Sequence, residues 1–209
     1  MQIFSRSCKN WFVGLGLITS MLVLVPFTVY AYGGMLLFDN FFDGSLFNHP
    51  ESVHNPVWEL TAFAGRQHRI IDDGTGTGNK VYRCPGTRIE SGSDDWTDVE
   101  IEIKFRLVSE NDVGQNFRLL WITPRFNKED TSKNFNVDLH YEPGSGFNYR
   151  VIRNRDKAEL TNVKLGESPY EVFGYDWHIY TIKVMGNVVT SYIDGKAIPG
   201  GQVELDRVY

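Results

Sequence analysis

Polar side chains that could bind a ligand alternate with apolar ones in the segment 135–141. Asn136, Asp138 and His140 stand two residues apart in it, so an extended chain would turn all three to the same side of a sheet. An amide, a carboxylate and an imidazole together donate and accept hydrogen bonds in several directions. The spacing therefore predicts a polar surface able to bind the hydroxyl groups of a sugar.

Arginine and aromatic side chains are expected beside this surface. Arg118 and Arg150 fall on the polar sides of neighbouring segments, and Trp121 or Tyr149 offers a ring that could stack on the apolar face of a pyranose. The alternative is a ladder of polar cross-strand pairs that solvates the sheet and binds nothing. For each residue taken singly, including His140 as a metal ligand or a base, the alternative is a polar side chain that only solvates the sheet.

Period-two alternation predicts the strands that would carry these residues. In the segment 98–107 apolar residues alternate with charged ones, as in an antiparallel strand with one wet face. The same alternation recurs in five further segments, 117–122, 135–141, 147–153, 178–184 and 188–193.

Turn residues separate these segments, among them Gly186-Asn187 and Asp194-Gly195. Beyond position 40 no stretch of ten or more residues has helical periodicity, and we expect residues 167–175 to form a loop. The chain is therefore predicted to be all-β, a sandwich or barrel of antiparallel strands.

The composition excludes several classes of protein. The 209 residues carry a formal net charge of -5 without a block of like charges, so no nucleic-acid binding is expected. Two cysteines, Cys8 and Cys84, cannot make a disulfide framework. The histidines outside the strand 135–141 form no zinc-ligand series; they are His49, His54, His68 and His178.

The N-terminus has the order of an export signal. Arg6 and Lys9 precede an uncharged apolar run that ends at Val29-Tyr30-Ala31, which offers acceptable cleavage positions. An uncleaved anchor is the alternative, because about 20 apolar residues can cross a bilayer. We expect residues 1–31 to be a signal peptide or signal anchor and residues 32–209 to be one secreted or extracytoplasmic domain. The membrane would be a partner only through an unprocessed N-terminal segment.

The segment 176–196 carries the most specific motif. Its sequence, DWHIYTIKVMGNVVTSYIDGK, closely resembles a hairpin of concanavalin A-like lectin and glucanase domains, including laminin-G-like members. Residues 38–44 followed by Trp58, and the stretches 96–103 and 114–118, resemble other strands of these domains. The resemblance implies a two-sheet antiparallel jelly-roll sandwich with one concave sheet, and it specifies the fold better than the function.

Two kinds of enzyme are related to such domains. The laminarinase type needs Glu-x-Asp-x-x-Glu on one strand, whereas Glu100 and Glu102 lack the third acid, so we interpret them as a solvated strand surface. A looser similarity to the 3-keto-disaccharide hydrolase-like group rests on Phe42-Asp43-Gly44, Trp58, Asn111, Gly114 and Arg118. It leaves glycoside cleavage as an alternative function.

The resemblance also bears on metals and on chain length. Domains of this kind often hold one structural calcium ion, and Asp39 and Asp43 are the matching donors unless they are turn residues. No cofactor is expected to be required. Closing C-terminal strands that such domains possess have no counterpart after Leu205, so we expect an incomplete chain.

These observations imply an extracellular polysaccharide-binding module that uses the concave face of one sheet. The expected ligand-binding residues are Arg118, Trp121, Asn136, Asp138, His140 and Arg150. A glycoside-cleaving enzyme of the 3-keto-disaccharide hydrolase-like type and an adhesive laminin-G-like module that binds protein are the alternatives.

Overall fold

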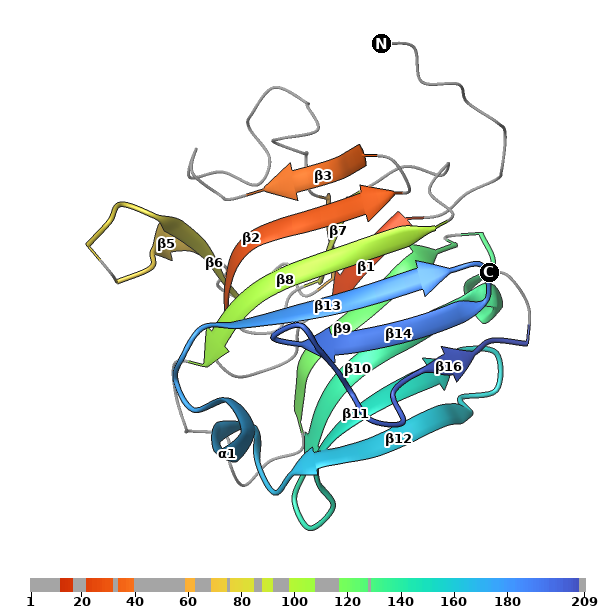
Figure 1. Ribbon diagram of the computed structural model, residues 1–209. Coiled ribbons are helices and arrows are strands. Elements are labelled where there is room, and N and C mark those ends of the chain that lie inside the picture. The colour runs from red at the N-terminus through yellow and green to blue at the C-terminus, as the bar shows by residue number, and fades with distance from the viewer. Residues whose placement is uncertain are drawn as a thin grey trace, which may run out of the picture.

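Two antiparallel β-sheets make up the part of the chain that the computed structural model describes (Figure 1). The backbone is described for residues 12–16, 22–31, 34–39, 59–62, 69–74, 76–84, 88–91, 98–107, 117–127 and 129–206. Side chains are described for residues 70–74, 76–80, 98–107, 118–127 and 129–206.

The first sheet has seven strands in the order β12-β11-β10-β9-β1-β7-β4. Their bounds are β12 Glu159–Gly166, β11 Gly146–Arg153, β10 Phe135–Glu142, β9 Phe117–Phe126, β1 Phe12–Gly16, β7 Arg88–Ser91 and β4 Glu59–Ala62. A 3-10 turn, Thr131–Lys133, connects β9 to β10.

The second sheet has nine strands, of which seven follow the order β15-β14-β13-β8-β2-β6-β5, while β16 pairs with β14 and β3 with β2. Their bounds are β15 Lys196–Ala197, β14 Val188–Ile193, β13 His178–Met185, β8 Val99–Leu107, β2 Leu22–Ala31, β6 Lys80–Cys84, β5 Arg69–Asp72, β16 Val203–Glu204 and β3 Gly34–Asp39.

The six strands predicted from alternation are confirmed, and the described chain is an all-β sandwich. In β8 every second residue is buried and the residues between are half-buried, because one face packs on the other sheet. The buried residues of β8, β13 and β14 form one apolar cluster with those of β9, β10 and β11. Burial of this shared core is the main stabilising contribution, since apolar area removed from water is worth roughly 25 cal/mol per Å².

Residues 167–175 contain a short helix, α1 (Pro169–Phe173), rather than the expected loop. The Ser168 side chain accepts a hydrogen bond from the backbone N–H of Glu171, and Pro169 stands in the first turn, which is favourable helix-start chemistry. A helix of one turn is too short to have readable periodicity. Its Phe173 is buried edge-on against Phe105 and Phe147, with ring centroids 5.0 and 5.5 Å away. No helix in the described part of the chain is long and apolar enough to cross a membrane.

The segment predicted to direct export contributes two strands. β2 pairs with β8 from Leu22 opposite Leu107 to Ala31 opposite Val99, and β1 pairs with β9 and β7. An apolar, valine-rich run satisfies the demands of a strand as well as those of a signal sequence. The pairing therefore does not test export, and the signal peptide stays a prediction.

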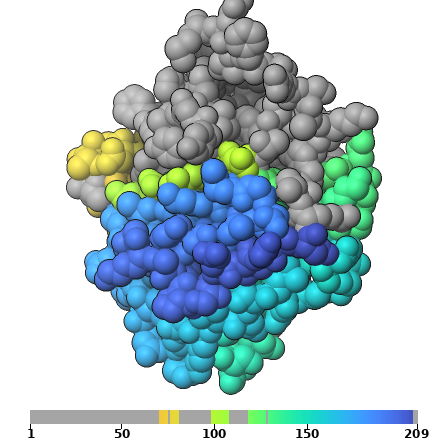
Figure 2. Space-filling model, turned by 45° about the vertical axis from the view of Figure 1, so that its right-hand side comes forward, coloured from red at the N-terminus to blue at the C-terminus, as the bar shows by residue number. Residues whose placement is uncertain are grey.

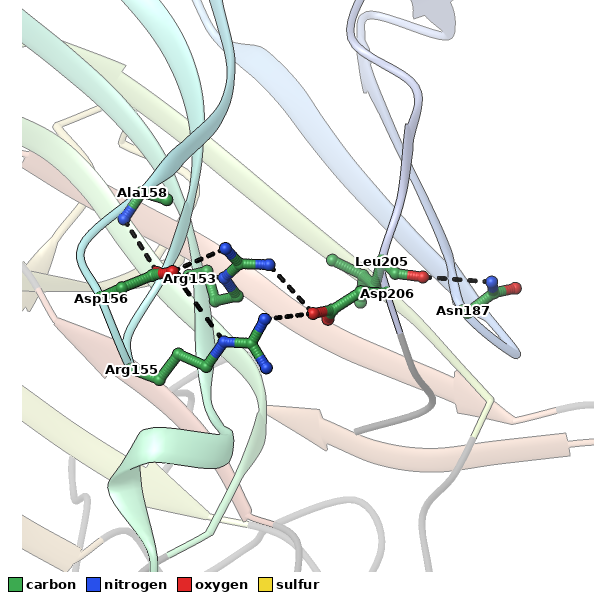
Figure 3. A network of polar contacts seen from close by, with 7 residues as sticks. All are labelled: Arg153, Arg155, Asp156, Ala158, Asn187, Leu205 and Asp206. Carbon is green, nitrogen blue, oxygen red and sulfur yellow. Dashed lines mark hydrogen bonds and ion pairs between the residues drawn. The ribbon is translucent and has the colours of Figure 1, made fainter.

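A polar network joins the two sheets at one edge (Figure 3). Asp206, which follows β16, binds Arg153 at the end of β11 and Arg155 in the next turn. Arg153 also binds Asp156 through two hydrogen bonds, and these bonds lower the pKa of Asp156 to about 2. The C-terminal residues (blue) accordingly lie directly against β11 and β12 (cyan) in the space-filling view (Figure 2).

We expect export to remove residues 1–31, so that the mature chain begins at Tyr32. N-terminal sequencing of the chain recovered outside a secreting host measures this directly. A mature chain that starts at Tyr32 would mean that β1 and β2 are absent from the working protein. An intact N-terminus on a correctly folded chain would contradict cleavage and assign both strands to the native sheets.

Phe173→Ala is expected to destabilise the fold by about 3–5 kcal/mol, because it opens a cavity beneath α1. Urea unfolding followed by tryptophan fluorescence measures the loss. The matched control is Tyr175→Ala, since Tyr175 is half exposed and its truncation should change the stability little. Equal effects of the two substitutions would contradict the packing described for α1.

Candidate functional site

Three adjacent strands, β9 to β11, bring the expected binding residues to one side of the seven-stranded sheet. Asp138 pairs with Trp121 on β9 and with Arg150 on β11, and His140 pairs with Arg118 on β9 and with Asn148 on β11. The opposite side of these strands belongs to the core. We call this side the polar face, and its members are Arg118, Trp121, Thr123, Asn136, Asp138, His140, Asn148 and Arg150.

Tyr149 does not belong to the polar face. It is fully buried in the core, and its hydroxyl donates to the carbonyl oxygen of Gly201 at 2.9 Å. Burial raises the pKa of this phenol to about 12, so it remains a neutral donor. Tyr149 is therefore excluded as a stacking platform, and Trp121 is left as the expected aromatic residue on this face.

Asp138 is the centre of the polar face. Its side chain is 1% exposed, and its Oδ2 atom accepts from Arg150 Nη2 at 2.7 Å and lies 3.3 Å from Arg118 Nε. Burial raises the pKa of this carboxyl, while the charges of Arg150 and Arg118 oppose the rise and stabilise the ionised form. Oδ1 of Asp138 has no hydrogen-bond partner in the described part of the protein.

The two arginines differ in how completely they are neutralised. Arg150 has a second carboxylate, Glu159 on β12, whose Oε1 accepts from Nη1 at 3.1 Å. Among the described residues Arg118 pairs with Asp138 alone, and its guanidinium lies over the Trp121 ring, with Cζ 3.7 Å from the ring centroid. Such a cation–π contact contributes roughly 0.5–1 kcal/mol at a partly exposed site. This contact holds the guanidinium in place over the ring.

His140 is the least satisfied polar residue on this face. It is 5% exposed, and neither ring nitrogen has a hydrogen-bond partner within the described residues. Burial, followed by the charges of Arg150 and Arg118, lowers the pKa of His140 from 6.5 to about 4. The imidazole is therefore neutral at physiological pH, able to donate from one nitrogen and to accept at the other.

Asn136 is engaged within the protein. Its Oδ1 accepts from the Thr123 hydroxyl at 2.7 Å, and its Nδ2 donates to Asn154 Oδ1 at 2.5 Å. Both ends of the amide are used, so Asn136 ties β10 to β9 and to the turn after β11. This matches the polar-ladder alternative for that residue, whereas Asp138 and His140 keep unpaired atoms.

Sequence reasoning missed Asn148, Glu159 and Asn162. Asn148 lies beside His140 and donates to the carbonyl oxygen of Gly146. Glu159 accepts from both Arg150 and Asn162. The alternation of β11 places Asn148 with Arg150 and could have found it. β12 gives no such signal, since exposed and half-buried positions along it do not alternate regularly.

Glu100 and Glu102 lie on the other sheet, on the side of β8 that faces away from the core. Glu100 binds Lys183 at 2.9 Å, and Glu102 stands opposite Thr181. Both are half-buried strand-surface residues. The interpretation of this pair as a solvated strand surface stays a prediction.

The predicted calcium donors lie where the side chains are not described. Asp39 is the last residue of β3, where its backbone pairs with Phe27, and Asp43 lies outside the described residues. Within the described side chains no group of three or more histidine, cysteine, aspartate or glutamate residues is arranged to hold a metal ion. Calcium binding by Asp39 and Asp43 stays a prediction.

Comparison with known proteins gives no family: no family model, no curated protein and no solved structure matches the chain. The resemblance to concanavalin A-like domains remains a prediction from the motifs in the sequence. The functional argument therefore depends on the residues of the polar face.

The low pKa of His140 predicts a specific loss of stability in acid. Because the folded pKa is about 4 and the ordinary value is 6.5, the unfolded chain takes up this proton first as the pH falls. The contribution is constant above pH 6.5 and is lost between pH 6.5 and 4. Urea unfolding of the wild type should show this loss over and above that of His140→Gln. Parallel pH profiles for the two proteins would contradict the shift.

Proposed function

We propose that this chain is an exported glycan-binding module and that the polar face, which we expect to be concave, is its binding surface. One observation carries the proposal. Arg118 is fixed by Asp138 at Nε and by Trp121 across its plane, and no described residue takes its terminal nitrogens. An arginine held in place with free donors is preorganised to bind a ligand.

The chemistry of this surface suits a sugar. The Arg118 side chain is 28% exposed and offers donors to hydroxyl or ring oxygens, and it lies over the ring of the half-buried Trp121. Carbohydrates present hydroxyl groups at their edges and C–H groups on their faces, which match arginine and tryptophan respectively.

Two buried residues, Asp138 and His140, pair with Arg118 and Trp121 across the neighbouring strands. Oδ1 of Asp138 and the ring nitrogens of His140 are shielded from solvent and lack partners among the described residues. An unpaired buried polar atom costs roughly 1–3 kcal/mol. A hydrogen bond from an ordered water at these atoms would offset that cost.

Glycoside cleavage of the 3-keto-disaccharide hydrolase-like type is the second candidate, and His140 is the observation that favours it. A neutral imidazole two residues along the strand from a buried carboxyl is a combination that general acid–base catalysis uses. With a pKa of about 4, however, this imidazole is a weak base at neutral pH, and both its nitrogens are shielded from solvent. Binding is therefore the better supported of the two functions.

Affinity electrophoresis through gels that carry a panel of polysaccharides, with reducing ends assayed on the same mixtures, tests this function. We expect retardation by at least one polysaccharide without release of reducing ends. Trp121→Ala should weaken the retardation by about tenfold. Trp177→Ala is the matched control, because Trp177 contacts Lys104 and Arg106 of the other sheet.

Three results would overturn the proposal. Release of reducing ends would establish the enzymatic alternative. Equal retardation of the wild type and of Trp121→Ala, with normal thermal midpoints, would remove the polar face from the binding site. No retardation by any polysaccharide, from a folded sample, would leave the adhesive protein-binding alternative.

A further inference from the structure

We propose that the glycan bound by the polar face carries a carboxylate, as a hexuronate does, and that the two terminal nitrogens of Arg118 receive it. This inference rests on the proposed function, because it names the chemical class of ligand for the same surface. The distribution of charge around Asp138 supports it.

The first step concerns the fork of Arg118. A guanidinium can bind a carboxylate in a bidentate manner along either of two edges. In Arg118 the edge that contains Nε faces Oδ2 of Asp138 at 3.3 Å, while the edge formed by Nη1 and Nη2 has no partner in the described part of the chain. The contact with Trp121 holds the guanidinium that carries this free edge in place. A planar carboxylate matches such an edge better than a lone hydroxyl does.

The second step concerns the balance of charge. One oxygen, Oδ2 of Asp138, lies close to two guanidinium groups, and a second described carboxylate, Glu159, binds Arg150. Arg118 is therefore the under-neutralised cation of the cluster. The whole chain carries a net charge of -5, so this positive point is a local feature and does not follow from a generally basic protein.

The third step concerns the charge of the neighbouring imidazole. Burial, followed by the charges of Arg150 and Arg118, lowers the pKa of His140 to about 4 and keeps the ring neutral. Burial disfavours a charge of either sign, so it is the two guanidinium groups alone that favour an anion here. The neutral ring of His140 introduces no charge that would compete with an anion.

The probes are alginate, polygalacturonate and hyaluronate, each compared with its own methyl ester, with which it shares its backbone. We expect at least one acid form to bind at least about tenfold more tightly than its ester, because a charge-assisted bidentate contact is lost on esterification. Raising the sodium chloride concentration from about 0.05 to 0.5 M should weaken the binding of the acid form and leave the ester unchanged.

Variants at one position separate charge from geometry. Arg118→Gln should lower the affinity for the acid form to that of the ester, and Arg118→Lys should retain part of the difference, since it keeps the charge and loses the fork. Arg155→Gln is the matched control: it removes one arginine from the network around Asp206, outside the polar face. Should Arg118→Gln fail to fold, Arg118→Lys, which keeps a cation beside Asp138, carries the test.

The outcomes distinguish this inference from the function on which it rests. Equal binding of acid and ester forms, or binding of neutral polysaccharides alone, would contradict the proposal that the ligand carries a carboxylate and would leave glycan binding intact. Preferential binding of a sulfated galactan over every uronate would likewise overturn the carboxylate. Failure to bind any glycan, from a folded sample, would overturn both.

Discussion

The packing of two apolar sheet faces against each other is the constraint on which the remaining structure depends. Strand alternation gives every residue of a paired strand only two directions, toward the other sheet or away from it. Once Val137, Leu139 and Tyr149 are committed to the core, their neighbours must lie on the opposite side. The polar face is therefore a consequence of core formation, and the position of Asp138 follows from burying the residues on either side of it.

On the polar face, Asp138 organises the surrounding side chains. Its carboxylate is almost wholly buried, and removing such an ion from water is costly unless partners compensate. Arg118 and Arg150 supply that compensation from the two flanking strands. Because Glu159 relieves Arg150 alone, the pair is unsymmetrical, and Arg118 becomes the residue with unused donors. Arg150 is thus paired with two carboxylates of the protein, whereas Arg118 keeps terminal donors that no described residue takes and that a ligand could use.

The strands and the shared face of Asn136, Asp138 and His140 could be predicted, because period-two alternation is a local signal. The direction of Tyr149 could have been read in the same way, since a residue adjacent to Arg150 on one strand must face the other side. By contrast, α1 escaped prediction because one helical turn has no periodicity. The roles of Glu159 and Asn162 were hidden because β12, at one end of the sheet's strand order, has no regular burial pattern.

By itself, the sequence determined that the chain is all-β, that a hairpin turns at Gly186-Asn187, and which polar residues share a side of β10. These features follow from the spacing of residues along the chain, which can be read directly from the sequence. Only the tertiary structure decided that Asn136 is fully engaged, that Arg118 lies on Trp121, and that Asp138 serves two arginines through one oxygen. Such facts depend on strand register and on side-chain direction between strands. The sequence leaves both open, because contacts across a sheet join residues that local patterns do not relate.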